Sequence, residues 1–258
     1  MNSDTINHLL ELNQRFYQTF AAQFAATRQR IQPGVRRVIT NLASNSSVLD
    51  LGCGNGELWR AFQQAGHTGR YIGLDSSLEL LQVAIREDPS RLTPSSQLQE
   101  GLFNRRPAAS PAFYQADLAV PDWHAPLAGL TFDTVLAFAV LHHLPGRTLR
   151  LQLLHKIHQL LAPGGYFIHS NWQFLNSPRL RLRIQPWDTV NISEDLLEPQ
   201  DYLLDWRHGG LGLRYVHHFS EPELAQLALE SDFEVVESFY SDGEGKHLAL
   251  YQIWALRS

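Results

Sequence analysis

Residues 46–62 read SSVLDLGCGNGELWRAF, and they carry the strongest indication of the fold. The apolar residues 48–51 predict a short buried strand, glycines follow at positions 52, 54 and 56, and residues 57–62 have a helical pattern. Glycine permits a sharp turn and lets a ligand approach the backbone amides. The G-x-G-x-G spacing differs from the G-x-G-x-x-G spacing of dinucleotide-binding proteins. The stretch therefore predicts a strand, a ligand-binding loop and a helix in that order.

Acidic residues stand in or after three predicted strands. Asp50 lies in the strand before the glycine loop, Asp75 follows a second strand in GRYIGLDSS (69–77), and Asp117 follows a third in AFYQADLAV (112–120). Apolar segments at 132–144 and 161–172 predict two further strands. Parallel strands point their carboxyl ends to one edge of a sheet, so we expect these carboxylates along one crevice. Asp75 stands about 20 residues beyond the loop, where an acidic residue can accept hydrogen bonds from ribose hydroxyls.

In these motifs, residues 46–171 resemble the class I S-adenosylmethionine-dependent methyltransferases. The resemblance implies an α/β, Rossmann-like class I methyltransferase fold, with a seven-stranded, mostly parallel sheet and helices on both faces. It implies S-adenosyl-L-methionine as the cofactor, with its amino-acid end at Asp50 and the glycine loop, its ribose at Asp75, and its adenine at Asp117 and the amide of Leu118. The implied cofactor-binding set is Asp50, Gly52, Cys53, Gly54, Gly56, Asp75, Ser76, Asp117, Leu118 and Phe138.

Composition bounds the class of protein. The chain has 258 residues, of which 44% are hydrophobic and 18% charged, so we expect one globular domain over residues 1–258. No apolar run approaches the roughly 20 residues that span a bilayer, and no secretory signal is visible, so we expect a cytoplasmic enzyme with no membrane partner. The single cysteine excludes a disulfide framework and multi-cysteine metal sites, and we predict no metal. A net charge of −5 argues against nucleic-acid binding over the whole surface.

Three segments flank or interrupt the predicted sheet. Residues 1–40 predict a helical lid, in which Arg28 falls on the same stripe as Tyr17, Phe20, Ala21, Phe24 and Ile31. Its head either reaches water beyond a packed stem or faces a polar site under the helix. Residues 86–111 predict a polar surface loop. Residues 173–215 predict a substrate-recognition insertion after strand five, in which Arg179, Arg181 and Arg183 would share one face of an extended segment, either solvated or in contact with phosphates.

Several stretches resemble the tRNA wobble-uridine carboxymethyl methyltransferases, which esterify 5-carboxymethyluridine. These are FYQTFAAQFAATRQRIQPGV with its F-x-x-T-R, VLDLGCGNG, AVLHHL, the PW at 186–187, and RYVHHFSEPELAQLALESDFEVVESFYSD. The resemblance implies methyl transfer to a tRNA carboxylate. It makes Arg28 and Arg214 a candidate clamp for that carboxylate, with His142 and Tyr215 lining the pocket. A carboxylate is already an anion, so it needs orientation rather than a strong base.

Other interpretations stay open at this stage. Eukaryotic members of that family use a small zinc-binding activator, and the strand at 112–116 would offer it a sheet edge. Arg214 could instead pair with an acidic residue between 194 and 205, and His217 and His218 could be core or helix-entry residues. Trp172, Phe174, Trp187 and Trp206 could wall a pocket for a small acid, a phenol or a quinone-like molecule. A non-catalytic, cofactor-binding scaffold is a further alternative, which the three aspartates disfavour.

Overall fold

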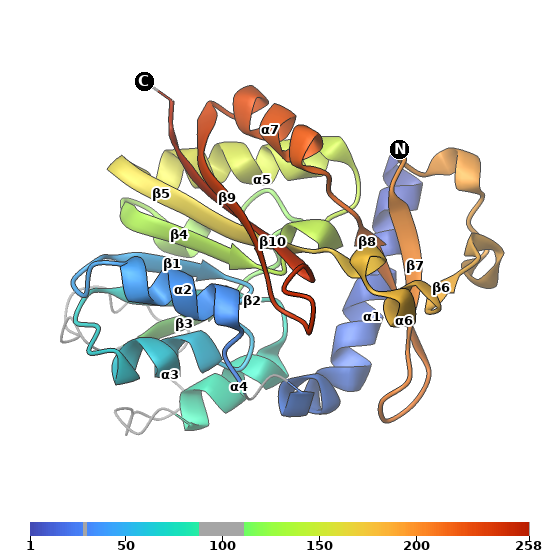
Figure 1. The fold of residues 1–258 in the computed structure, drawn as a ribbon, viewed down its shortest axis with the longest axis horizontal. Coiled ribbons are helices and arrows are strands. Elements are labelled where there is room, and N and C mark those ends of the chain that lie inside the picture. The colour runs from blue at the N-terminus through green and yellow to red at the C-terminus, as the bar shows by residue number, and fades with distance from the viewer. Residues whose placement is uncertain (28–29, 88–110, 258) are drawn as a thin grey trace.

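The centre of the molecule is a seven-stranded sheet (Figure 1). The structure, a computed structural model, describes residues 1–27, 30–87 and 111–257. The strand order is β3-β2-β1-β4-β5-β10-β9, in which β1 to β5 are parallel and β10 runs antiparallel to both β5 and β9. The strands are β1 (Val48–Leu51), β2 (Tyr71–Asp75), β3 (Ala112–Gln115), β4 (Phe132–Phe138), β5 (Leu161–Trp172), β9 (Phe233–Ser241) and β10 (Ala249–Leu256). The prediction of a mostly parallel, seven-stranded sheet is confirmed.

Helices cover both faces of this sheet. One face packs against α2 (Pro33–Asn41), α3 (Glu57–Gln64) and α4 (Leu78–Arg86), and the other against α5 (Arg147–Leu160) and α7 (Glu221–Glu230). Successive residues of a strand point to opposite faces, so Val48 joins the α2–α4 core while Leu49 and Leu51 join the α5–α7 core. The near-continuous apolar run in β1 is therefore what a strand buried on both faces requires.

A second, smaller sheet of three antiparallel strands stands beside the first. It is formed by β6 (Ile184–Gln185), β7 (Asp201–Trp206) and β8 (Gly212–His217), and α1 (Ser3–Thr27) packs against β8. Figure 1 shows α1 and these strands together at one end of the molecule. Short helices complete the connections: η2 (Ala125–Leu127), η3 (Leu141–His143), η4 (Phe174–Asn176), α6 (Pro178–Arg181), η5 (Trp187–Val190) and η6 (Glu194–Leu196). The predicted insertion at 173–215 contains most of this sheet, but its last strand continues to His217.

The predicted extended segment with three arginines on one face is wrong. Arg179 and Arg181 lie in the short helix α6, which Pro178 begins, and only Ile184 and Gln185 pair as a strand. Proline suits the first turn of a helix because it lacks the backbone N–H that would have no partner there. Arg183 is separate from the other two and forms an ion pair with Asp205 at 3.5 Å.

The buried side of α1 differs from the predicted stripe. Leu9, Asn13, Phe16 and Phe20 are buried, whereas Tyr17 is half-buried. The helix is kinked at Phe20, whose ring lies so close to Gly212 of β8 that a Cβ there would stand 2.4 Å from it. Glycine at this position permits the close approach of helix and strand. Arg28, and the side chain of Phe24, lie outside the described residues, as does most of the predicted loop at 86–111.

Candidate functional site

A cavity of about 660 Å³ lies at the carboxyl ends of the parallel strands. From α1 it receives Asn7, Asn13, Gln14 and Tyr17. From the sheet it receives seven of the ten predicted cofactor-binding residues, namely Gly52, Gly54, Asp75, Ser76, Asp117, Leu118 and Phe138. These residues, from Gly52 to Phe138, span 86 positions of the chain, and the fold brings them together at one edge of the sheet.

The glycine loop is held in place by backbone hydrogen bonds to the next strand. The N–H groups of Gly52 and Cys53 both donate to the carbonyl of Leu74, at 2.8 and 3.0 Å. Gly52 has φ +73° and Gly54 has φ +55°, in the left-handed region that glycine adopts at little cost. The loop thus turns sharply at the end of β1 and exposes backbone to the cavity.

Asp75 is the carboxylate that faces this loop. Its two oxygens accept hydrogen bonds from the N–H groups of Gly54 at 2.8 Å and Ser77 at 2.9 Å. Burial raises the pKa of Asp75, and the backbone donors of Ser77 and Gly54 oppose that shift. Carboxylate oxygens have further lone pairs, so this side chain retains capacity to accept hydrogen bonds from a ligand's hydroxyl groups.

Three predicted cofactor residues do not line the cavity. Asp50 is buried and accepts a hydrogen bond from the Tyr71 hydroxyl, so it supports the loop from within the core. Burial raises the pKa of Asp50 to about 7. The Cys53 thiol is also buried, and a Cβ on Gly56 would stand 2.8 Å from that of Ala84 in α4. These residues shape the loop rather than form its surface.

His142 and Tyr215, predicted to line the acceptor pocket, do not line this cavity. Both are buried: His142 Nδ1 accepts from the N–H of Trp172 at 3.3 Å, and the Tyr215 hydroxyl donates to Asp201 at 2.7 Å. The neighbouring His143 lines the cavity instead, and its Nε2 lies 2.7 Å from the hydroxyl of Tyr17. The sequence located the two histidines near the end of strand β4, but only the structure shows which imidazole ring faces the cavity.

Arg214 lies in an aromatic cage. Its guanidinium carbon is 4.8 Å from the ring centre of Trp172, 5.2 Å from that of Phe16 and 5.8 Å from that of Trp206, and the residue is 6% exposed. Its Nε has no hydrogen-bond partner, and among the described residues it forms no ion pair. The alternative that it pairs with an acid between 194 and 205 is therefore not observed. Burying a charge without a counterion is costly, so this cage favours an anionic ligand.

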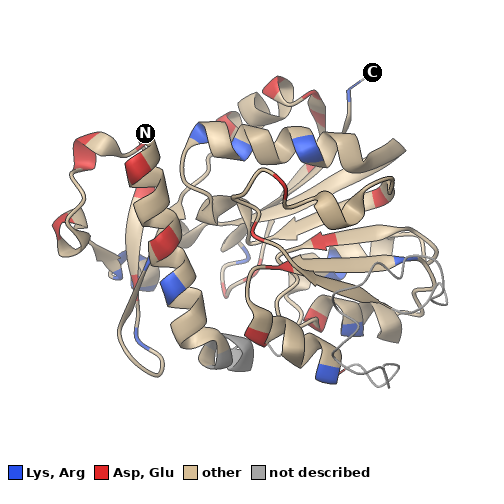
Figure 2. Ribbon diagram, turned by 180° about the vertical axis from the view of Figure 1, so that it is seen from behind, with Lys and Arg blue, Asp and Glu red and all other residues tan. Residues whose placement is uncertain are grey.

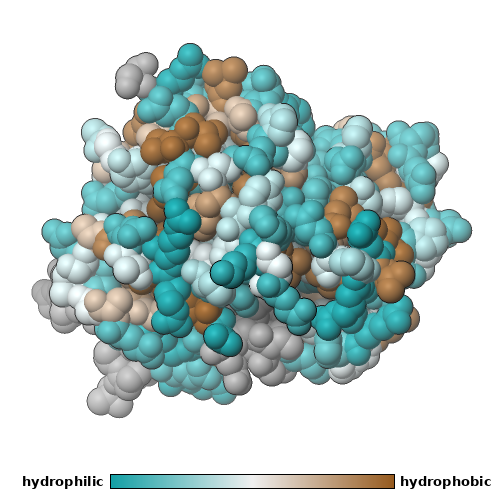
Figure 3. All heavy atoms as spheres, in the orientation of Figure 1, coloured by the Kyte–Doolittle hydropathy of each residue, from teal (hydrophilic) through white to brown (hydrophobic). Residues whose placement is uncertain are grey.

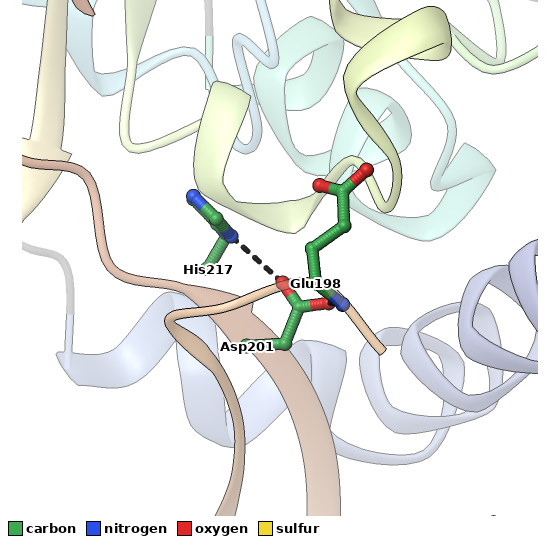
Figure 4. A group of neighbouring side chains, drawn as sticks. All are labelled: Glu198, Asp201 and His217. Atoms are coloured by element: carbon green, nitrogen blue, oxygen red, sulfur yellow. Dashed lines mark hydrogen bonds and ion pairs between the residues drawn. The ribbon is translucent and has the colours of Figure 1, made fainter. Parts of the chain in front are cut away.

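The acidic residues of that region are engaged elsewhere. Glu198, Asp201 and His217 lie together, with potential ligand atoms within 4.8 Å of one another (Figure 4). Arg150 of α5 supplies the cation at this cluster: it donates to Glu198 at 3.0 Å and to the Tyr215 hydroxyl at 2.8 Å. His217 Nδ1 lies 2.7 Å from Asp201. His217 Nε2 also lies 2.8 Å from Glu223 of α7, so this network joins the small sheet to α5 and α7. Arg150 already supplies the positive charge that the acidic residues of the network need.

A family model described as "Methyltransferase domain" matches residues 22–238. The chain belongs to this methyltransferase family, and the fold and cavity define the class as S-adenosylmethionine-dependent methyltransferases. Its cofactor is S-adenosyl-L-methionine. The glycine loop and the Asp75 carboxylate at the strand ends suit a ligand that carries hydroxyl groups. None of the described helices is both long and apolar enough to span a bilayer.

Individual relatives are more distant. The chain is 28% identical to a putative methyltransferase of Encephalitozoon cuniculi, over 86% of this chain and 87% of that protein. It is 26% identical to the tRNA (carboxymethyluridine(34)-5-O)-methyltransferase of Schizosaccharomyces pombe, over 74% of this chain and 65% of that protein. A Haloferax volcanii putative methyltransferase, solved with the Trm112 methyltransferase activator, has the same fold, with TM-score 0.61, 14% identity, and coverage of 95% and 97%.

Proposed function

We propose that this methyltransferase esterifies the carboxylate of 5-carboxymethyluridine at the wobble position of tRNA. The observation that carries the proposal is Arg214, a buried guanidinium with no counterion among the described residues. Arginine suits a carboxylate because its planar fork can hold one oxygen while the other is free to react. Sequence similarity to enzymes named for this activity supports the choice of acceptor.

Two paths connect the cage to the cavity. Phe16, in ring contact with Tyr17 at 5.1 Å, joins the cage to a residue of the cavity wall. The backbone N–H of Trp172 donates a hydrogen bond to His142, and the next residue, His143, lines the cavity. An acceptor held by Arg214 would thus sit beside the wall made by α1 and η3, next to the proposed cofactor.

The chemistry asks little of the protein beyond position. When bound, S-adenosyl-L-methionine supplies a methyl group on a positively charged sulfur. A carboxylate acceptor is already an anion, so the protein would not need to remove a proton from it. Arg214 would orient the carboxylate, and the rings of Phe16, Trp172 and Trp206 would exclude water. Orientation alone can supply up to about 7–11 kcal/mol of the barrier.

A small organic acid is the competing acceptor. The same guanidinium would hold any carboxylate, and the aromatic rings of the cage are as well suited to an apolar acid as to a base. A phenol fits less well, because it must lose a proton before it can match a permanent cation.

A small zinc-binding activator on β3 is a further part of the proposal. β3 pairs with β2 along one side and forms the edge of the seven-stranded sheet. Such an edge can accept an added strand from a partner. The Haloferax volcanii fold relative was solved with a methyltransferase activator, which supports a partner subunit for this chain.

The test is methyl transfer to defined acceptors. Purified chain, with and without a co-expressed activator, would receive labelled cofactor and tRNA bearing 5-carboxymethyluridine, and nucleosides would be read by mass spectrometry. We expect the methyl ester with this tRNA and none with tRNA carrying unmodified uridine. Labelling of small acids in place of tRNA would overturn the acceptor assignment.

A further inference from the structure

Most described Lys and Arg side chains have a partner within the protein. For example, Arg37 pairs with Glu237, Arg60 with Glu57, and Arg147 with Glu230. Among the described residues, the cations with no ion pair, side-chain hydrogen bond or ring contact are Arg30, Arg36, Arg70, Arg179, Arg181, Lys246 and Arg257. Five of these seven belong to three neighbouring elements, which are the start of α2, the β9–β10 hairpin, and α6.

Hydrogen bonds fix the order of these elements. On one side of the hairpin, the N–H of Gly34 in α2 donates to the Asp242 carboxylate at 2.9 Å. On the other side, the Asn176 side chain, just before α6, donates to the carbonyl of His247 at 2.9 Å. The hairpin thus bridges α2 and α6. Figure 1 shows the three elements in a row on the face turned to the viewer, and Figure 3 shows hydrophilic side chains over α2 and the hairpin tip.

The α2 end of this row is concave. A hollow of about 490 Å³ there is lined by Arg30, Arg36 and Arg37 together with uncharged residues, and none of the described acidic residues lines it. Arg37 is held by Glu237 and stacks on the Phe239 ring at 4.0 Å, so Arg30 and Arg36 are the two that can meet an outside ligand. All five cations of the row are exposed.

We propose that Arg30, Arg36, Lys246, Arg179 and Arg181, named here the α2–α6 strip, bind the phosphodiester backbone of an RNA acceptor. This rests on the proposed function, in which the acceptor is RNA. The chain carries a net charge of −5, so cations gathered on one face are a local exception to its charge. In Figure 2, seen from behind, Asp and Glu positions are coloured on α1 and on the segment beside the small sheet, so that part of the surface is less favourable for a polyanion.

The strip is also connected through the chain to the proposed acceptor site. Trp172, whose ring contacts Arg214, is followed two residues later by the helix η4 that leads into α6. A loop of RNA laid along the strip would therefore place one of its nucleotides near the aromatic cage. Phosphate contacts of this kind position a nucleic acid without reading its sequence.

The test is the salt dependence of RNA binding. The probe is a fluorescent anticodon stem-loop, titrated with the unaltered chain and with its Arg36→Gln/Arg181→Gln variant. If the variant loses two single-strand phosphate contacts, the plot of log K against log salt becomes less steep by about 1.4 than for the unaltered chain. At 0.1 M salt this corresponds to about 25-fold weaker binding of RNA by the variant. The matched control is Arg70→Gln/Arg257→Gln, which removes two exposed cations outside the strip. Glu244→Gln, which removes an acid from the hairpin, should tighten binding.

The outcomes separate this proposal from the proposed function. Cofactor titration of each variant reports folding. If the strip variant binds RNA with unchanged slope, or if the control weakens binding equally, the strip is overturned while esterification of tRNA can persist. If the unaltered chain binds vesicles containing anionic lipid but not RNA, and the strip variant no longer binds these vesicles, the RNA assignment is overturned. Failure of ester formation with undiminished, strip-dependent RNA binding overturns only the acceptor chemistry.

Discussion

Asp75 and Arg214 belong to two parts of the molecule that hold charge in opposite ways. Asp75 sits at the end of a parallel strand, and backbone N–H groups of Gly54 and Ser77, near it in the chain, satisfy it. Arg214 sits in the small antiparallel sheet, surrounded by rings from Phe16, Trp172 and Trp206, and no acid satisfies it. Backbone donors already stabilise the Asp75 charge before a ligand arrives, and its remaining lone pairs can accept further hydrogen bonds. The Arg214 charge is left for a ligand to neutralise, which suits the acceptor side of a transfer reaction.

The comparison predicts the largest effect at Asp75. Replacing Asp75 by Ala removes two charge-assisted hydrogen bonds from the loop and the proposed ribose acceptor, at about 1.5–3 kcal/mol for each interaction lost. We expect S-adenosyl-L-methionine affinity to fall more than about 100-fold in calorimetric titration. Asp133→Ala, at the opposite end of a strand where Asp133 binds Ser47, is the control and should retain binding. Undiminished cofactor binding by Asp75→Ala would remove this residue from the site.

Arg214 comes next, with a different signature. Arg214→Ala should lower kcat/KM for the acceptor about 100-fold while cofactor affinity stays unchanged, because the lost contact is a bidentate one to the acceptor alone. Arg214→Lys should fall between, since it keeps the charge but loses the fork. Arg207→Ala, just after β7 and paired with Asp205, is the matched control. An equal loss in both alanine variants would mean that the sheet, not the cage, was damaged.

The contact between the two parts should give a smaller effect. Tyr17→Phe removes the hydroxyl that lies 2.7 Å from His143 in the cavity wall. One hydrogen bond of this kind is worth about 0.5–1.5 kcal/mol, so we expect about a threefold to tenfold loss of cofactor affinity. Tyr202→Phe, which removes an exposed hydroxyl, should have no effect. A normal affinity in Tyr17→Phe would show that α1 does not support the cofactor site through this pair.

A separate effect, on stability rather than on binding or turnover, is its dependence on pH. Burial raises the pKa of Asp50 from 3.8 to about 7, so the folded protein holds this proton more tightly than the unfolded chain. The stabilisation is present at low pH and is lost as the pH rises through that window. Asp50→Asn should make the free energy of unfolding, measured with urea, fall less between about pH 4 and pH 7. Asp133→Asn should leave this slope unchanged, because hydrogen bonds from Ser47 lower the pKa of Asp133.

The same comparison explains how much the sequence could predict. The cofactor side depends on residues close in the chain and on strand ends, and seven of its ten predicted residues line one cavity. Asp50, Cys53 and Gly56 are buried and do not line this cavity, because a motif does not show which of its atoms reach the surface. The cage around Arg214 joins residues 16, 172, 206 and 214, and no periodicity connects them. The arginines of α6 were predicted in an extended segment because charged and apolar residues alternate there. Such alternation indicates a strand only where the segment is long enough to pair with another strand.

The contact between α1 and β8 also sets an order of assembly. The Asn13 side chain accepts a hydrogen bond from the N–H of Tyr215 and donates to its carbonyl, although the two residues are 202 positions apart. During synthesis, α1 leaves the ribosome long before the strand that it packs against. The parallel sheet has its local partners early, whereas the roof of the cavity closes only when β8 is made. Docking of the first helix on a late strand would then be the step that makes the protein competent to hold its cofactor.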